Sequence, residues 1–261
     1  MQAGRVERRA DSGIVVAALA NGSTNAIDPE IVRRLSLLLA QAAEDPEVEG
    51  LVLAGAGGKF FSIGFDIPKL YPLSREEFEP FFAAFNRLCL DLYAFPKPTV
   101  AAIAGHAVAG GCILSICCDR RIVADGRTLM GLNTVKLGVP VPLVVQSILG
   151  RLLGARRAAD LVAAGDFHAG EELLRLGLAD EARPAGSVIE AAVDTARSLG
   201  AASLAAYAEA KRARAAEVLE EVEPALEERN RAFVDAWYAP PARQLLREAM
   251  GRFRREPHAG P

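Results

Sequence analysis

The sequence contains no unbroken apolar run of the roughly 20 residues that cross a bilayer. Its longest apolar stretch, residues 99–118, is interrupted by Gly105, His106, Gly110 and Gly111. It also lacks an excess of positive charge, because 30 Lys and Arg stand against 33 Asp and Glu, a formal net charge of −3. These absences predict a protein that has no membrane as a partner and does not bind nucleic acid.

Cysteine is scarce as well. The four cysteines are Cys89, Cys112, Cys117 and Cys118, and they form neither the CxxC pairs nor the Cys/His set that a zinc site requires. We therefore expect buried free thiols and no metal site. Together with the lack of a secretory signal pattern, the unpaired thiols predict a cytoplasmic location.

What the sequence does have is apolar material for a large core. Hydrophobic residues make up 51% of the 261 residues and charged residues 24%, which is typical of a folded globular chain. Short apolar strands alternate with helices in the first half, and helices fill the second half. This order predicts an α/β core over residues 1–199 and a helical region over residues 200–261.

Several elements can be placed from local signals. Asp28 is predicted to cap a helix whose first residue is Pro29, and a longer helix is expected over residues 75–93, before Pro96 and Pro98. Apolar runs between turn signals predict buried strands; they cover residues 14–19, 50–54, 99–104 and 121–124.

Two glycine-rich loops each follow an apolar strand, at residues 57–66 and 104–112. Gly64 can adopt a backbone conformation closed to other residues, and Asp66 is expected to cap the next helix. Neither loop has the spacing of a phosphate-binding motif. Because amide N–H groups in such turns and at helix N-termini stabilise negative charge, the two loops together predict a composite site for an anionic oxygen.

The same segments resemble the enoyl-CoA hydratase/isomerase (crotonase) superfamily, most closely the Δ3,Δ2-enoyl-CoA isomerases. Residues 61–66 resemble the motif F-[AS]-x-G-x-D, and residues 98–112 resemble P-x-[IV]-A-A-[IV]-x-G-x-[AC]-x-G-G-G. Residues 118–124 are similar to C-D-x-x-[IV]-A. Residues 25–27 match an early N-A-[LIM] element, and residues 161–177 resemble a later L-x-G-x-x-x-x-A pattern.

The resemblance implies a crotonase-like spiral of repeated ββα units, with C-terminal helices that assemble a homotrimer or a dimer of trimers. It implies an oxyanion hole formed by the backbone N–H groups of Ile63 and Gly110, which stabilises the enolate-like anion of an acyl-CoA thioester. Coenzyme A enters as part of the substrate, and no other cofactor is implied. The resemblance assigns CoA binding to residues of the two loops and the early element. They are Asn25, Ala26, Ser62, Ile63, Gly64, Phe65, Asp66 and Gly110.

The sequence departs from the family where the hydratases carry two catalytic glutamates. Ile113 and Thr134 occupy those positions, and neither side chain transfers a proton at neutral pH. The sequence Gly131-Leu132-Asn133-Thr134 resembles the G-L-N-E motif of the isomerases, but Thr134 stands in place of the glutamate. We therefore expect negligible hydration of enoyl-CoA.

Other residues remain as candidates for the missing chemistry. His106 titrates near neutral pH and is a candidate catalytic residue beside the second loop, or a substitution that points away from it. Thr134 is a second candidate, since with Asn133 it is placed to orient a water or a substrate carbonyl. Asp66, Glu76 and Glu77 are weaker candidates, because helix capping or a solvated helix surface accounts for each of them. A set of phenylalanines suggests an acyl pocket or core packing; it comprises Phe65, Phe78, Phe81, Phe82 and Phe85.

Three functions stay open at this point. The first is an enzyme of the isomerase branch that acts on CoA thioesters of fatty acid metabolism. The second is decarboxylation or thioester hydrolysis on the same oxyanion hole. The third is a non-catalytic member that binds acyl-CoA or serves as an assembly partner.

Overall fold

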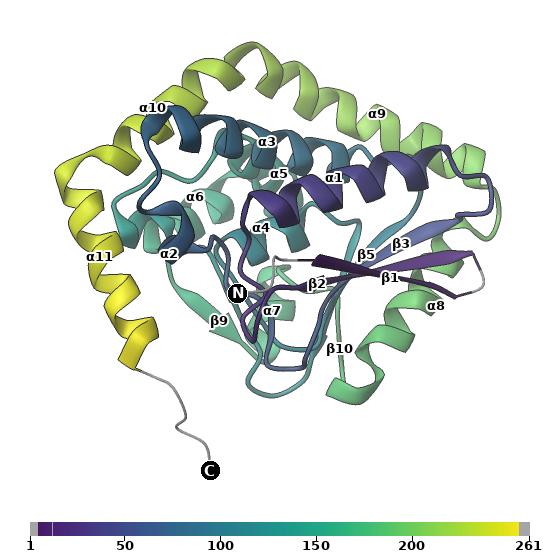
Figure 1. Ribbon diagram of the computed structural model, residues 1–261. Helices are drawn as coiled ribbons and strands as arrows, with labels where there is room; N and C mark the ends of the chain where they lie inside the picture. The colour runs from purple at the N-terminus through teal and green to yellow at the C-terminus, as the bar shows by residue number, and fades with distance from the viewer. Residues whose placement is uncertain (1–4, 12, 256–261) are drawn as a thin grey trace.

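A computed structural model describes residues 5–11 and 13–255, and its strands form two sheets (Figure 1). The larger sheet has the order β1-β2-β3-β5-β7-β10. Its strands are β1 Arg5–Asp11, β2 Ile14–Ala20, β3 Gly50–Gly55, β5 Thr99–Ile103, β7 Arg120–Ala124 and β10 Glu181–Arg183. Only the β1–β2 pair is antiparallel.

The smaller sheet has the order β4-β6-β8-β9. Its strands are β4 Phe60–Ser62, β6 His106–Val108, β8 Leu129–Gly131 and β9 Phe167–Ala169. The pairs β4–β6 and β6–β8 are parallel, while β9 runs antiparallel to β8. Each of β4, β6 and β8 follows a strand of the larger sheet and precedes a helical segment, so the chain repeats a strand–strand–helix unit.

Helices follow each pair of strands and fill the C-terminal part. The α-helices are α1 Pro29–Glu44, α2 Ile67–Leu70, α3 Arg75–Tyr93, α4 Gly110–Ile116, α5 Leu143–Leu153, α6 Ala155–Ala164, α7 Glu171–Leu176, α8 Val188–Gly200, α9 Leu204–Val222, α10 Leu226–Tyr238 and α11 Pro240–Arg255. Short 3-10 helices are η1 Thr134–Leu137, η2 Ala185–Ser187 and η3 Glu223–Ala225. Among the described residues, no helix is long and apolar enough to cross a membrane.

The larger sheet is buried on both faces, which explains the near-continuous apolar character of its central strands. One face packs against α8, where Val188, Ala192 and Ala196 meet side chains of β2, β3, β5 and β7. The other face lies under α1, α3 and α4 in the main core. Figure 1 shows α1 and α3 on one side of the sheet and α8 on the other.

The stronger local predictions are confirmed. The Asp28 carboxylate accepts a hydrogen bond from the Ile31 N–H at 2.9 Å, with Pro29 as the first residue of α1. Helix α3 spans the predicted residues, and its N-cap, Ser74, forms a reciprocal capping box with Glu77. All four cysteines are buried and free.

Other elements differ from expectation. The smaller sheet was not predicted, because its strands have three residues each and so carry too little alternation to recognise. The helical region predicted over residues 200–261 contains a break, because η3, which includes Pro224, separates α9 from α10. Proline lacks the N–H that would continue the helical hydrogen bonding there.

Candidate active site

The two glycine loops meet in direct backbone contact. Gly64 has φ = 87°, and a Cβ atom there would lie 2.7 Å from the Gly110 amide nitrogen. A Cβ atom at Gly110 would lie 3.1 Å from the Gly64 Cα. Glycine is therefore needed for this approach, which brings the end of β4 next to the start of α4.

Two backbone amides at this contact have no hydrogen-bond acceptor within the described part of the chain. Ile27 pairs with the residues on either side of Phe65 in an isolated β-bridge. Its N–H donates to the Gly64 carbonyl at 2.7 Å, and its carbonyl accepts from the Asp66 N–H at 2.8 Å. This pattern leaves the Phe65 N–H pointing the other way. Gly110 is the first residue of α4, and its N–H has no partner either. Both residues line the same cavity.

The prediction of Ile63 as an oxyanion donor is corrected by this geometry. The Ile63 N–H donates to the Thr24 carbonyl at 3.1 Å, so it is already engaged inside the protein. Gly64, with φ = 87°, turns the backbone between Ile63 and Phe65, and the motif alone did not fix which of their N–H groups faces the cavity. The Ile63 side chain, by contrast, lines the cavity.

Asn25 and Ser62 hold the first loop in place from behind. Asn25 is fully buried with φ = 50°, and its Nδ2 donates to the carbonyls of Ala56 and Phe60, both at 2.8 Å. The Ser62 hydroxyl donates to the Asn25 carbonyl at 2.7 Å and accepts from the Gly64 N–H at 3.1 Å. These residues and the buried Ala26 do not line the cavity, so in this structure they support the loop.

Asp66 serves as the expected helix cap. Its carboxylate accepts a hydrogen bond from the Lys69 N–H at 3.2 Å at the start of α2. The Lys69 ammonium also bridges Asp66 and Asp28, at 3.3 Å and 2.6 Å. This ion-pair group ties α2 to the start of α1, and Asp66 is not among the residues that line the cavity.

Ala109, which precedes Gly110, has a strained backbone conformation that positions the Gly110 amide. It has φ = 46° and ψ = −114° at the N-cap of α4, a region that favours glycine. Hydrogen bonds fix it on both sides, from its N–H to the Gly131 carbonyl and from the Ile113 N–H to its carbonyl, both at 2.9 Å. Strain of this kind persists where surrounding contacts determine the conformation.

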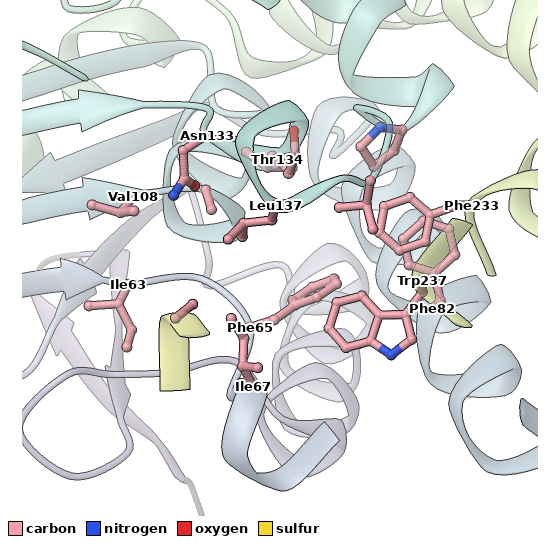
Figure 2. A pocket seen from close by; sticks show the side chains of 16 residues that line it. Ile63, Phe65, Ile67, Phe82, Val108, Asn133, Thr134, Leu137, Phe233 and Trp237 are labelled. Carbon is pink, nitrogen blue, oxygen red and sulfur yellow. The ribbon is translucent and has the colours of Figure 1, made fainter. Parts of the chain in front are cut away.

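The cavity at these amides has a volume of about 290 Å3 and extends between the two sheets' loops and the C-terminal helices (Figure 2). Its walls are mainly apolar. They consist of Ile63, Phe65, Ile67, Phe82, Val108, Ala109, Gly110, Ile113, Asn133, Thr134, Leu137, Val139, Pro142, Phe233, Trp237 and Ala249. Figure 2 shows Val108 and Asn133 at one end and Phe82 and Trp237 at the other.

The aromatic cluster is divided between cavity and core. Phe65 and Phe82 line the cavity, while Phe78, Phe81 and Phe85 are buried behind them. Two further aromatic rings of the lining were missed in the sequence. They are Phe233 and Trp237 of α10, and Phe233 stacks on Phe82 with ring centroids 3.8 Å apart. Their spacing of four residues on one helix face was the available signal.

No ionisable side chain is among the residues that line the cavity. Ile113 and Thr134, which stand at the family's two glutamate positions, both line it. The cavity therefore offers two amide donors for an oxyanion but no carboxylate or imidazole for proton transfer.

The predicted proton carriers lie elsewhere. The His106 Nδ1 accepts a hydrogen bond from the Leu129 N–H at 3.1 Å, and its ring packs edge-on to Phe60. Burial first, and then the nearby Lys59 ammonium, lower the pKa of His106 below its ordinary value, which keeps Nδ1 free to accept. Glu76 and Glu77 are exposed in the first turn of α3. None of the three lines the cavity.

Three of the lining residues also carry polar side-chain atoms that are buried away from the cavity. Asn133 Oδ1, Thr134 Oγ1 and Trp237 Nε1 are buried and have no hydrogen-bond partner among the described residues. In Figure 2 the Asn133 amide reaches toward Val108, whereas the Thr134 hydroxyl is turned away from Leu137 and Phe65.

The chain matches a known protein family. The enoyl-CoA hydratase/isomerase family model matches residues 9–256. The chain therefore belongs to the enoyl-CoA hydratase/isomerase family, as the motifs predicted.

The relatives include proteins named as isomerases and proteins named as hydratases. Enoyl-CoA delta isomerase 1, mitochondrial, from Mus musculus is 29% identical over 184 residues, which are 70% of this chain and 64% of the relative. A putative enoyl-CoA hydratase from Thermus thermophilus is 37% identical over 171 residues, 64% of this chain and 66% of the relative. The chain thus matches slightly less than two thirds of the length of these relatives.

Solved structures agree on the fold. Human mitochondrial delta3-delta2-enoyl-CoA isomerase has a TM-score of 0.93 at 24% identity, covering 97% of this chain and 100% of that one. Pseudomonas aeruginosa OdaA has a TM-score of 0.79 at 28% identity, covering 94% and 98%. The predicted crotonase-like fold is confirmed.

Proposed function

We propose that the protein binds an acyl-CoA thioester with its carbonyl oxygen between the N–H groups of Phe65 and Gly110, and stabilises an enolate-like anion there. The observation that carries this proposal is the pair of unbonded amides facing one apolar cavity. Preorganised donors of this kind lower the barrier by about 3–4 kcal/mol each in acyl-transfer sites. The acyl chain would extend toward Phe82, Phe233 and Trp237.

The scaffold is proposed to be that of the isomerase branch, with altered chemistry. Support comes from the names and folds of the relatives and from the Gly131-Leu132-Asn133 sequence. Hydration needs one group that activates water and one that protonates the α-carbon, each contributing typically 10²–10⁴-fold. Ile113 and Thr134 supply neither, so crotonyl-CoA hydration should be negligible.

Calorimetry tests the binding. Octanoyl-CoA should bind, and its thioether analogue, which lacks only the carbonyl oxygen, should bind about tenfold more weakly, because two hydrogen bonds of about 0.5–1.5 kcal/mol each are lost. Free CoA serves as the control for contacts outside the acyl group. Absence of heat with every ligand at millimolar concentration contradicts the proposal, and equal affinity for thioester and thioether contradicts the oxyanion hole alone.

Decarboxylation on the same donors is the second candidate, favoured by the lack of an ionisable side chain in the lining. When a 2-carboxyacyl thioester loses CO2, the electron pair of the broken C–C bond forms the enolate, and the α-carbon then takes a proton from water. This sequence needs an oxyanion site but no protein base. Incubation with malonyl-CoA, followed by mass spectrometry for acetyl-CoA, tests it; unchanged malonyl-CoA excludes it.

We also propose a homotrimer or a dimer of trimers. Support comes from large apolar side chains on the surface, since Phe167 is 41% exposed and Leu174 is 39% exposed. Light scattering should give about three or six times 27.7 kDa, and a monomer at micromolar concentration contradicts the proposal.

A further inference from the structure

The turn between β2 and α1 contains Asn21-Gly22, the one Asn-Gly pair of the sequence. Gly22 and the following Ser23 are exposed. Gly22 has φ = 62°, and a Cβ atom there would meet no atom within 4 Å. Its N–H donates to no acceptor within the described part of the chain. The Gly22 backbone nitrogen is therefore unhindered and unengaged, directly beside a side-chain amide.

This pair of groups can react without a co-reactant other than water. The Gly22 nitrogen attacks Cγ of Asn21 and gives its proton to water, the bond from Cγ to Nδ2 breaks, and ammonia leaves. The product is a five-membered succinimide ring. Water then opens the ring at one of its two carbonyls, which leaves aspartate or isoaspartate at this position. Glycine favours the attack because it has no Cβ to obstruct its nitrogen.

Contacts in the folded protein restrain the Asn21 amide. Its Nδ2 donates to the Ala26 carbonyl at 2.7 Å and to Oδ2 of the buried Asp28 at 3.2 Å. These bonds fix the orientation of Cγ, so the reaction requires the turn to open locally. Exposed turns with few buried contacts open at low cost in free energy. We therefore expect a reaction that is slower than in an unfolded peptide but not blocked.

The product does not fit the place that Asn21 occupies. A carboxylate there has no N–H to donate, so the Ala26 carbonyl loses its donor. The new negative charge also lies beside the Asp28 carboxylate, and like charges at this distance repel. Isoaspartate adds a methylene group to the backbone and changes the path of the turn as well.

The same turn supports the first glycine loop. The Asn25 N–H donates to the Asn21 carbonyl at 3.1 Å, and the Asn21 N–H donates to Oδ1 of Asn25 at 3.3 Å. Asn25 in turn holds the loop from behind, and the adjoining Thr24 carbonyl accepts the Ile63 N–H at 3.1 Å. A change at Asn21 thus reaches the segment that carries the Phe65 amide.

We infer that Asn21-Gly22 is a site of spontaneous deamidation, and that its product weakens the support of the first glycine loop. The modification is irreversible and needs no enzyme, so it limits the lifetime of the intact loop. Its effect on ligand binding rests on the proposed binding of acyl-CoA, whereas the modification and its effect on stability do not.

Mass spectrometry of the folded protein, incubated at mildly alkaline pH and then digested, tests the modification. The peptide with Asn21 should gain the mass difference between a hydroxyl and an amino group, and fragmentation should locate the change at Asn21. Asn25, which is buried and precedes alanine, is the internal control and should stay intact. In Gly22→Ala the reaction should be several-fold slower, because the added Cβ obstructs the nitrogen.

A synthetic peptide of residues 14–27 provides the reference rate. If Asn21 of the folded protein stays intact after the peptide has reacted completely, the site is overturned. Equal rates in the wild type and Gly22→Ala overturn the attack by the Gly22 nitrogen. If Gly22→Ala does not fold, a rate in the folded wild type equal to that of the peptide overturns the restraint by the Asn21 contacts.

Two variants test the consequence. Asn21→Asp has the side chain of one product and should lower the melting temperature by about 2–4 °C, as expected for the loss of one hydrogen bond in a chain of this size. Asn21→Ala removes the donor without adding charge, and its melting temperature should lie between those of Asn21→Asp and the wild type. A melting temperature of Asn21→Asp equal to that of the wild type overturns the structural effect.

Binding of octanoyl-CoA separates this inference from the proposed function. It should be weaker in Asn21→Asp than in the wild type. If the wild type binds no acyl-CoA, the proposed function is overturned, while the mass and melting measurements still decide the inference. If both proteins bind octanoyl-CoA equally, the proposed function stands and the link from Asn21 to the first glycine loop is overturned.

Discussion

Two buried polar regions of this molecule differ in how completely their groups are paired. Around Asp119, which is 4% exposed in its side chain, the carboxylate receives the Lys211 ammonium and the Arg214 guanidinium, both at 2.6 Å, and the Thr99 N–H at 2.8 Å. At the cavity, the N–H groups of Phe65 and Gly110 have no acceptor in the described chain. Complete pairing marks a structural cluster, whereas unpaired donors at a cavity mark a place for a ligand.

The paired cluster joins distant parts of the chain. Lys211 of α9 also donates to the Lys97 carbonyl and to the Thr99 hydroxyl, both at 3.1 Å. It thereby fixes α9 to the start of β5 and to Asp119 just before β7. The cavity lies where the two glycine loops meet the C-terminal helices. Ion pairs such as that of Lys69 and Asp66 stand beside it, but none of the side chains that line it is ionisable.

Placing a charge in the cavity should produce the largest change. Thr134→Glu restores the side chain that the isomerases carry at this position. An apolar surrounding should raise the pKa of the introduced carboxyl toward neutral pH, which suits a general base. Isomerisation of 3-enoyl-CoA, followed by absorbance of the conjugated product, should appear or rise by about 10²–10⁴-fold.

Thr134→Gln is the matched control, since it has nearly the same size and transfers no proton. It should remain at the wild-type rate. A wild-type protein that already hydrates crotonyl-CoA at about 10 per second would show that another residue carries the proton, and His106 would then be the first to replace.

Breaking the paired cluster should cause the next largest effect, this time on stability. Asp119→Ala leaves the buried Lys211 ammonium, 2% exposed, without its counter-charge. Removing one partner of a buried ion pair typically costs about 3–5 kcal/mol. Urea unfolding should show a loss of this size, whereas Asp166→Ala, which removes an exposed partner of Lys136, should leave the midpoint unchanged. Equal midpoints for the two variants would contradict the structural role of the cluster.

The sequence predicted the framework of this comparison but only part of its detail. Long apolar strands, the caps at Asp28 and Asp66 and the two glycine loops have strong local signals, and all are present. The amide without an acceptor is that of Phe65 rather than that of Ile63, because the direction of an amide here depends on the bridge to Ile27, which is distant in sequence. The four-residue spacing of Phe233 and Trp237 places them on one helix face, but which part of the molecule that face meets depends on how α10 returns over the core.

Ala109 offers a smaller effect at the edge of the cavity. Its positive φ is disfavoured for alanine by about 1–3 kcal/mol, while glycine loses about 0.5–1 kcal/mol through greater freedom in the unfolded chain. Ala109→Gly should therefore raise the free energy of unfolding by about 1 kcal/mol, measured by urea denaturation. A lower stability would show that the Ala109 methyl contributes more by packing than its backbone loses by strain.

The smallest expected effect is a change in how the free energy of unfolding depends on pH. Burial alone would raise the pKa of Asp119, but the charges of Lys211 and then Arg214 outweigh it and hold the pKa below the usual 3.8. The unfolded chain therefore binds the proton more readily than the folded one. The stability that this carboxylate contributes is present above about pH 4 and is lost as pH falls through the lower folded pKa.

Asp119→Asn removes this titration. Other acidic groups remain in both proteins, for example Glu30, whose pKa is lowered to about 2 by hydrogen bonds to Arg33 and Arg34. The difference in unfolding free energy between wild type and variant should therefore be constant from pH 7 to pH 5 and should narrow as the pH falls below about 4. Urea titrations at each pH measure it. Parallel curves over the whole range would mean that Asp119 has the same pKa in both states, and the paired cluster would then owe its stability to packing rather than to charge.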